Sequence, residues 1–140
     1  MKPKAIICDI DGTLALRPVL GRDPYDMSRV SEDLVRPETS TIVALMWEAG
    51  FDVIFCSGRD ETAREDTAKW IKNNVHVSAF LLLMREKGDG RKDAEVKQEM
   101  LDRHILPDYD VFCVFDDRRQ VVQMWRANGL TVFDVADGDF

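Results

Sequence analysis

The chain has 140 residues, of which 45% are hydrophobic, and this is enough for one domain with a buried core. The longest apolar runs, such as "AFLLLM", fall far short of the ~20 residues that a membrane span needs, and no stretch typical of a signal peptide precedes the first acidic motif. The net charge of −7 argues against a protein that coats nucleic acid through a broad basic surface, although a local basic pocket for one nucleic-acid end is compatible with it. We expect a cytoplasmic protein whose residues 1–140 form one domain.

Apolar runs alternate with helical patterns along the whole chain. The expected strands are residues 4–10, 51–58, 77–84, 110–117 and 130–135, and the expected helices are residues 36–50, 60–74, 94–105 and 118–129. This alternation predicts an α/β fold of the three-layer, Rossmann-like kind, with a parallel sheet of about five strands between helices. Ligands of such sheets bind beyond the carboxyl ends of the strands.

Polar motifs follow four of the five expected strands. "DIDGT" follows the first strand, "SGRD" the second, "REKGDGRKD" the third, and "DD" ends the fourth. Because the carboxyl ends of parallel strands meet at one edge of a sheet, we expect these motifs to converge. The convergence predicts one site rather than four separate turns.

Four carboxylates belong to this predicted site: Asp9, Asp11, Asp116 and Asp117. Carboxylates placed together repel one another and raise their own pKa values unless a cation lies among them. An all-oxygen cluster favours a hard ion, and Mg²⁺ that keeps several waters is the expected cofactor. All four aspartates are therefore candidate metal ligands.

The groups around the carboxylates indicate an anionic substrate. Thr13 and Ser57 carry hydroxyl donors, and Lys92 carries a positive charge next to a carboxylate nucleophile. A metal ion, a lysine and hydroxyl donors around one carboxylate are typical of phosphoryl transfer. In this interpretation Asp9 attacks phosphorus to form an aspartyl-phosphate, and Asp11 acts as the general acid and base.

The four motifs, in this order, resemble those of the haloacid dehalogenase (HAD) superfamily of phosphatases. The stretches "GRDPYD", "REKGDGRKDAEVK", "DDRRQVVQMWRANG" and "VADGDF" further resemble the phosphatase domain of bacteriophage polynucleotide kinase–phosphatases. The resemblance implies a hydrolase that removes 3′-terminal phosphates from DNA or RNA, and it leaves a phage origin open. No GxxxxGK[ST] stretch occurs, so we expect no kinase activity from this chain.

The resemblance also assigns roles to individual residues. It implies Asp9 as the nucleophile, Asp11 as the general acid–base and Lys92 as the residue that stabilises charge. It implies that Asp89, which lies in the same loop, supports that lysine. The candidate substrate-binding or phosphate-binding residues are Thr13, Arg22, Ser57, Gly58, Arg59 and Asp89.

Residues 15–36 separate the first motif from the next helix, and they are too few for an independently folded cap domain, which usually needs about 40 residues. An uncapped site suits the end of a polymer or a phosphorylated site on a protein, and it argues against a small metabolite that must be enclosed. Two alternatives stay open: a phosphatase of small nucleotides or other metabolites, and a receiver-like regulatory module that holds phosphate on Asp9. We expect no membrane partner, whereas the choice of DNA or RNA, activity on cyclic phosphates and a homo-oligomeric state are left open.

The cysteines and tryptophans are expected to be core residues. The odd cysteine count without CxxC spacing favours buried, reduced thiols. The residues concerned are Cys8, Cys56 and Cys113 and Trp47, Trp70 and Trp125.

Overall fold

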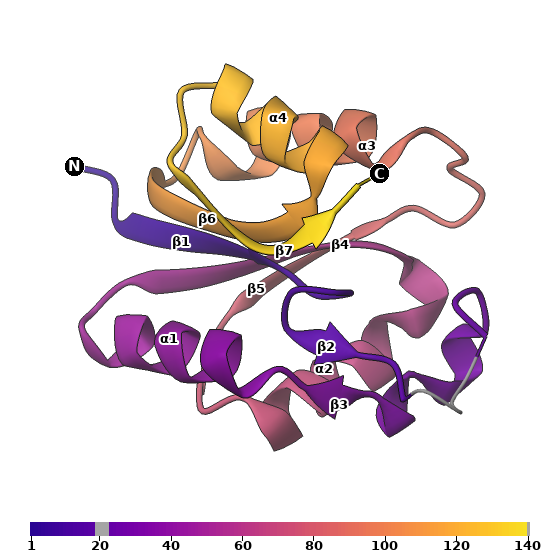
Figure 1. The fold of residues 1–140 in the computed structure, drawn as a ribbon. Coiled ribbons are helices and arrows are strands. Elements are labelled where there is room, and N and C mark those ends of the chain that lie inside the picture. Colours follow the sequence, from indigo (N-terminus) through magenta and orange to yellow (C-terminus); the bar gives the residue numbers. More distant parts are fainter. Residues whose placement is uncertain (19–22, 140) are drawn as a thin grey trace.

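The computed structural model describes residues 1–18 and 23–139 (Figure 1). The long strands are β1 (Lys4–Asp9), β4 (Asp52–Asp60), β5 (Leu81–Arg85), β6 (Asp110–Arg118) and β7 (Val132–Gly138), and the α-helices are α1 (Pro37–Glu48), α2 (Arg64–Asn74), α3 (Asp93–Met100) and α4 (Arg119–Ala127). The five strands form a parallel sheet in the order β5-β4-β1-β6-β7. The predicted α/β fold with a five-stranded parallel sheet is confirmed.

Helices cover both faces of the sheet. α1 and α2 lie on one face, and α3 and α4 lie on the other (Figure 1). Along β1 the side chains of Ile6 and Cys8 enter the core beneath α1 and α2, whereas Ala5 and Ile7 enter the core beneath α3 and α4. Because both faces are buried, this central strand is a continuous apolar run in the sequence.

The cysteines and two of the tryptophans are buried as expected. All three cysteines are free thiols in the interior. Trp70 is 3% exposed and Trp125 is fully buried, while Trp47 is partly buried and packs against the same core as Trp70.

Strand β5 begins later than the sequence predicts. The expected strand covered residues 77–84, but residues 77–80 are irregular and the ladder with β4 starts at Leu81. The chain needs these residues to pass from the end of α2 to the sheet. Val77 is buried there, and Phe80 packs edge-on against Phe55 with ring centroids 5.3 Å apart. The apolar residues at 77–80 therefore belong to a buried connection between α2 and β5 and not to the strand itself.

A group of short elements that the sequence analysis did not predict follows β1. It contains β2 (Ala15–Leu16), which pairs antiparallel with β3 (Leu34–Val35), and the 3-10 turn η1 (Met27–Glu32). The described residues between β1 and α1 form these short elements and no larger unit. Further short helical turns are η2 (Glu61–Ala63), which precedes α2, and η3 (Leu101–Ile105), which continues α3.

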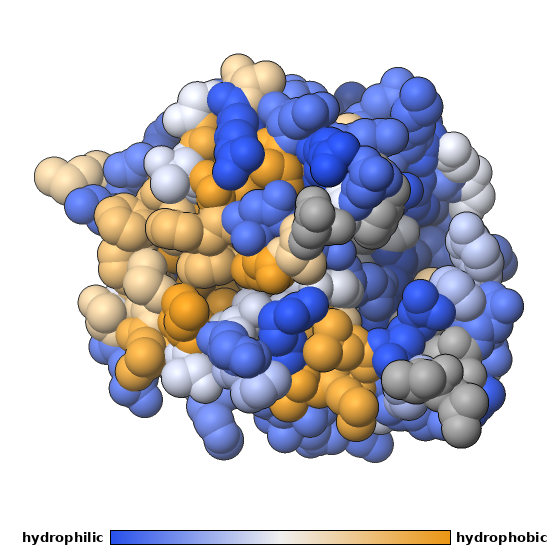
Figure 2. All heavy atoms as spheres, viewed as in Figure 1, coloured by the Kyte–Doolittle hydropathy of each residue, from blue (hydrophilic) through white to orange (hydrophobic). Residues whose placement is uncertain are grey.

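The surface of the molecule is unevenly apolar. In the view of Figure 2, hydrophobic residues gather over α1, β6 and β7, and the exposed members of this set include Leu45, Phe112 and Phe133. The side that carries η1 and the loop after β5 is hydrophilic (Figure 2). Among the helices of residues 1–18 and 23–139, none combines the length and the apolar character needed to cross a bilayer.

Candidate active site

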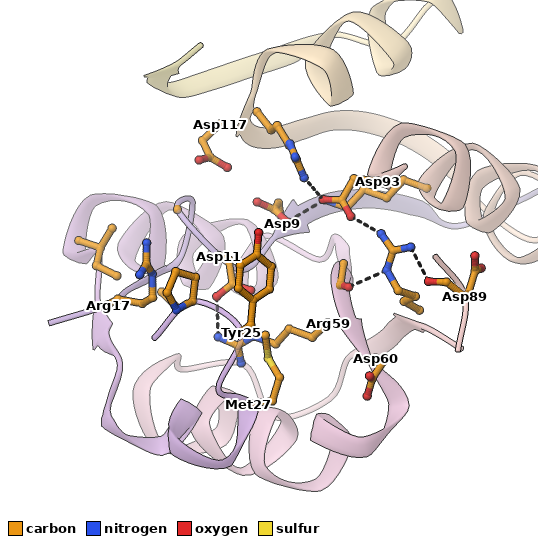
Figure 3. A pocket seen from close by; sticks show the side chains of 18 of the residues that line it. Asp9, Asp11, Arg17, Tyr25, Met27, Arg59, Asp60, Asp89, Asp93 and Asp117 are labelled. Carbon is orange, nitrogen blue, oxygen red and sulfur yellow. Dashed lines mark hydrogen bonds and ion pairs between the residues drawn. The ribbon is translucent and has the colours of Figure 1, made fainter. Parts of the chain in front are cut away.

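A cavity of about 930 Å³ opens at the carboxyl ends of β1, β4 and β6 (Figure 3). Its walls come from the chain after β1, from η1, and from the loop between β5 and α3. Asp9 and Asp11 from the first motif, Gly58 and Arg59 from the second and Asp117 from the fourth line this cavity. The predicted convergence of motifs at one edge of the sheet is therefore found in the structure.

Asp9 is the last residue of β1 and is 6% exposed. One of its carboxylate oxygens, Oδ1, accepts a hydrogen bond from Lys97 Nζ at 2.7 Å, and the other, Oδ2, lies 3.0 Å from the Thr13 hydroxyl. The same hydroxyl is 3.1 Å from Asp117 Oδ1. Since a hydroxyl carries one proton, Thr13 links the two carboxylates by donating to one of them at a time.

Three buried carboxylates meet beside this contact. Asp9, Asp116 and Asp117 each offer an oxygen, and these oxygens all lie within 4.8 Å of one another. Burial and the nearby Asp116 charge raise the pKa of Asp9 well above its ordinary value, and burial also raises the pKa of Asp117. A cation among the three would relieve both effects, and their oxygen-only donor set fits Mg²⁺. The Asp11 carboxylate, although predicted as a ligand, lies outside this cluster of described residues.

Asp116 is fixed by several donors at once. Its Oδ1 accepts hydrogen bonds from the backbone N–H groups of Asp117 at 2.8 Å and Arg118 at 3.3 Å. Its Oδ2 accepts a hydrogen bond from Trp125 Nε1 at 3.0 Å and lies 3.4 Å from Lys97 Nζ. A predicted core tryptophan is thus also a polar partner of the acidic cluster.

Lys97, not Lys92, is the lysine beside Asp9. Lys92 is exposed and precedes the first turn of α3, and no contact joins it to the carboxylate cluster among the described residues. Lys97 lies one turn further along the helix and is 1% exposed. Although burial disfavours its charge, Asp116 and Asp9 raise the pKa of Lys97 well above its ordinary value. The placement of Lys92 expected from the sequence is therefore wrong.

The spacing within α3 explains this correction. Asp93, Lys97 and Leu101 follow one another at intervals of four residues, so they share one face of the helix and its continuation. Val96 and Met100 on the neighbouring positions are buried, so this face packs against the sheet. The sequence signal for Lys97 was its place beside the apolar residues Val96 and Met100, and this signal is weak because α3 is short and carries charges on several faces.

Arg59 holds Asp11 by two hydrogen bonds. Its Nε and Nη2 lie 3.0 and 2.7 Å from the two Asp11 oxygens, and Nη2 is also 2.8 Å from Asp33 Oδ2. The remaining nitrogen, Nη1, donates to the Thr67 hydroxyl at 3.0 Å. Arg59 is 2% exposed. The guanidinium predicted to contact phosphate thus has protein acceptors on all three nitrogens, and Asp33 and Thr67 are site residues that the sequence analysis missed.

The other predicted residues of the second motif have backbone roles. The Ser57 hydroxyl is buried and accepts a hydrogen bond from the backbone N–H of Arg59 at 3.1 Å. Gly58 lines the cavity, and a Cβ at this position would collide with the Asp93 carboxylate. The absence of a side chain at Gly58 therefore lets α3 approach β4 closely.

Arg85 organises the loop that carries Asp89. Its guanidinium donates to the backbone carbonyls of Gly58 and Asp89, both at 2.9 Å, and to Asp93 Oδ1 at 2.6 Å. The Asp89 side chain pairs with Arg91 at 2.8 Å, and hydrogen bonds from Arg91 lower the pKa of Asp89 to about 2. Asp89 lines the cavity, but the lysine that it was expected to support is not among its partners. Arg22 lies outside the described residues.

The chain matches the family model of the polynucleotide kinase PNKP phosphatase domain over residues 3–140. A protein of Autographa californica nuclear polyhedrosis virus, named as a bifunctional polynucleotide kinase/RNA ligase, is 36% identical over 136 residues, which are 95% of this chain and 19% of that protein. In two solved structures of Pnkp1/Rnl/Hen1 complexes, one of them titled as an RNA repair complex, chains are 42% and 41% identical with TM-scores of 0.90 and 0.92.

These similarities cover this chain almost completely and the relatives only in part. The two structural matches include 99% of this chain but 44% and 48% of the matched chains. A class C acid phosphatase from Bacillus anthracis shares the fold, with a TM-score of 0.66 at 16% identity over 97% of this chain and 69% of that chain. The family match and its structural context show that the chain belongs to the polynucleotide kinase PNKP phosphatase-domain family and is a phosphatase of the HAD superfamily.

Proposed function

We propose that this phosphatase removes 3′-terminal phosphates from nucleic-acid ends through an aspartyl-phosphate on Asp9, with Mg²⁺ as cofactor. The observation that carries the proposal is the environment of Asp9 at the base of the cavity. Lys97 binds one of its oxygens at 2.7 Å, Thr13 lies 3.0 Å from the other, and two further carboxylates lie beside it. A cation, a hydroxyl donor and further carboxylates around one carboxylate support a nucleophilic role for Asp9 in phosphoryl transfer.

The covalent step transfers the phosphoryl group to the protein. Asp9 attacks phosphorus, and the bond between phosphorus and the 3′ oxygen breaks. Asp11 gives a proton to that oxygen, which leaves as a hydroxyl. In the second step water attacks phosphorus and gives a proton to Asp11, and the bond between phosphorus and the Asp9 oxygen breaks, which yields inorganic phosphate and the free Asp9 carboxylate.

Lys97 and Arg59 would act without forming covalent bonds. Lys97 places a positive charge beside Asp9. This charge would stabilise the negative charge on the phosphoryl oxygens as they approach Asp9. Arg59 holds Asp11 by both carboxylate oxygens, so we assign it the positioning of the acid–base group.

Asp9, Asp116 and Asp117 are the residues that would hold Mg²⁺. When bound, this ion neutralises charge that develops on the phosphoryl oxygens. The raised pKa values of Asp9 and Asp117 support this assignment, because a metal ion favours the ionised form of both groups.

The substrate class is supported by the openness of the cavity and by the relatives. The described residues between β1 and α1 form only short elements and leave about 930 Å³ accessible above Asp9. The matched chains of 41–42% identity belong to Pnkp1/Rnl/Hen1 complexes, one of which is an RNA repair complex by name. The open cavity leaves room for a bulky phosphate ester, and the names of the relatives favour a nucleic-acid end as that ester.

Phosphate release in the presence of Mg²⁺ tests the proposal. The substrates are an oligonucleotide with a 3′-phosphate, the same oligonucleotide with a 5′-phosphate, and a 3′-mononucleotide. We expect release from the 3′-phosphorylated oligonucleotide to be fastest, to require Mg²⁺, and to be abolished by Asp9→Asn. Preference for the mononucleotide would move the substrate to small nucleotides. A stable phosphate on Asp9 without release would instead indicate a regulatory module.

A further inference from the structure

Two side chains of the cavity wall have no part in the chemistry assigned above. Tyr25 precedes η1, and Arg17 follows β2, and both line the cavity that contains Asp9 and Asp11. In the close-up Asp11 lies between them, whereas Asp89 and Asp93 lie on the other side (Figure 3). Because Asp11 is the group proposed to protonate the leaving oxygen, Tyr25 and Arg17 border the side on which the leaving nucleoside would lie.

Tyr25 is far more exposed than a structural aromatic residue needs to be. Its exposed fraction is 89%, compared with 53% for Phe112 and 52% for Phe133. Its ring therefore contributes little to the core, although the burial of an aromatic side chain is a large source of stability. An aromatic ring exposed at the mouth of an open site is available to a planar ligand, and nucleobases stack on such rings irrespective of their sequence.

The backbone around Tyr25 is held on both sides. The N–H of Tyr25 donates to Asp23 Oδ1 at 2.9 Å, and Asp26 Oδ1 accepts the N–H of Ser28 at 3.1 Å where η1 begins. Aspartate side chains that bind the backbone two residues later stabilise tight turns. The ring is thus presented from an ordered turn, which lowers the entropic cost of stacking.

Arg17 differs from the other cations of the cavity. Lys97, Arg59, Arg85, Arg91 and Arg118 each have a carboxylate partner. Within residues 1–18 and 23–139, Arg17 has no ion pair and no side-chain hydrogen bond. Its exposed guanidinium is therefore a positive charge at the cavity wall that no carboxylate among the described side chains neutralises, and such a charge suits a phosphate group.

We infer that Tyr25 and Arg17 form a nucleotide subsite next to the phosphoryl site. Tyr25 stacks on the base of the nucleotide that carries the 3′-phosphate, and Arg17 pairs with the phosphodiester that joins this nucleotide to the one before it. The inference rests on the proposed function, because it takes the reacting phosphate to lie at Asp9. It explains how an open site distinguishes the end of a polymer from a small phosphate ester.

Three substrates separate the two contacts. They are a dinucleotide 3′-phosphate, the corresponding nucleoside 3′-phosphate, and an abasic tetrahydrofuran analogue of that nucleoside 3′-phosphate. The ratio of kcat/KM for the nucleoside to kcat/KM for the abasic analogue measures base recognition. The ratio for the dinucleotide to the nucleoside measures recognition of the phosphodiester.

We expect Tyr25→Ala to lower the first ratio by about tenfold, in line with one lost stacking contact, and Tyr25→Phe to retain it. We expect Arg17→Gln to lower the second ratio and to reduce the slope of log(kcat/KM) for the dinucleotide against log[salt] by about one. Arg103→Gln, which alters an exposed arginine outside the cavity, is the matched control and should leave both ratios unchanged. An equal loss on all three substrates would reduce Tyr25 and Arg17 to supports of the loop.

Binding of the unphosphorylated dinucleotide, measured by calorimetry, separates this inference from the proposed function. One outcome is that the chain hydrolyses none of the three substrates while Tyr25→Ala and Arg17→Gln each weaken binding of the dinucleotide. That result would support the subsite and contradict the proposed reaction. If the variants bind the dinucleotide as the unaltered chain does, the subsite is wrong whatever the catalytic result.

Discussion

At the level of single residues, Lys97 supplies the positive charge that pairs with two carboxylates of the acidic cluster, Asp9 and Asp116. Its ammonium lies 2.7 Å from Asp9 and 3.4 Å from Asp116, and it is almost fully buried. The removal of one partner from a buried ion pair leaves an uncompensated charge, which is strongly destabilising. Lys97 therefore has two effects that can be measured separately, one on folding and one on the reaction.

We expect Lys97→Met to lower kcat by about 100-fold or more, since the loss of one preorganised donor at a developing charge has an effect of this size. Lys92→Met is the matched control, because Lys92 is exposed and directly precedes the same helix, and the kcat of this variant should stay close to that of the unaltered chain. Phosphate release and thermal unfolding are measured on both variants, so that misfolding is not taken for lost chemistry. A larger loss of kcat in Lys92→Met than in Lys97→Met would contradict this assignment.

The sequence predicts residues at strand ends better than residues on helices. Asp9, Asp11, Asp116 and Asp117 were identified because a charged residue directly after an apolar run is a local signal. The role of Lys97 depends on which face of α3 packs against the sheet, and this is a property of the tertiary structure. Helix α3 is short and carries charges on several faces, so its amphipathic pattern does not single out one lysine.

Asp33 and Thr67 were missed for a different reason. Asp33 ends the short turn η1, Thr67 lies within α2, and both meet the Arg59 guanidinium in the interior. Their partner is 26 residues away from the first and 8 residues away from the second. No local pattern marks an aspartate or a threonine as the partner of a distant arginine, so this network appears only in three dimensions.

At the level of elements, the start of α3 is held to the sheet by a clamp of charges. The Asp93 carboxylate accepts from Arg85 at 2.6 Å and from Arg118 at 2.9 Å, which connects α3 to β5 and β6. Burial raises the pKa of Asp93, but Lys97 and the two arginines outweigh this effect and hold it below its ordinary value. Lys97 lies one helical turn after Asp93, so the same clamp positions its ammonium within 2.7 Å of the Asp9 carboxylate.

We expect Asp93→Asn to lower the free energy of unfolding at pH 7 by about 2 kcal/mol, the order of a hydrogen bond to a charged partner. Because the folded-state pKa of Asp93 is lowered, its stabilisation is present above the unfolded-state pKa of about 4 and is lost as the pH falls through the folded-state value. The difference between the variant and the unaltered chain should therefore shrink between pH 7 and pH 3 in urea titrations. Asp108→Asn, on an exposed turn, is the control. A difference that is constant over this range would contradict the clamp.

At the level of the whole molecule, the sheet order explains why the site lies where it does. β1 is the central strand, with β4 on one side and β6 on the other, so the motifs at the ends of these three strands are necessarily neighbours. The alternation of apolar runs and helical patterns predicted a parallel sheet and the convergence of these motifs at one of its edges, but not the order of the strands. It did not predict β2, β3 and η1, because two-residue strands carry too little pattern to be recognised.

The three cysteines are protected by the same sheet. Burial raises the pKa of Cys56 to about 12 and that of Cys113 to about 11, and the pKa of Cys8 is also well above its ordinary value. Since the thiolate is the reactive form, we expect modification by a disulfide reagent at pH 8 to be slower in the folded chain than in urea by about 100-fold or more. All three thiols should react quickly once the chain is unfolded. Rapid modification of a thiol under native conditions would show that the sheet opens locally at that strand.

The hydrogen bond between Trp125 and Asp116 connects the fluorescence of a tryptophan to the acidic cluster. The indole N–H donates to Asp116 Oδ2 at 3.0 Å, so any ion that draws on the oxygens of this carboxylate also changes the polarity at the edge of the indole. The emission of a buried indole follows such a change, so we expect the fluorescence of the unlabelled chain to shift if a metal ion binds at this cluster. Trp125→Phe, which keeps Trp47 and Trp70, supplies the background signal. Occupancy at the end of β6 can in this way be followed with no substrate in the cuvette.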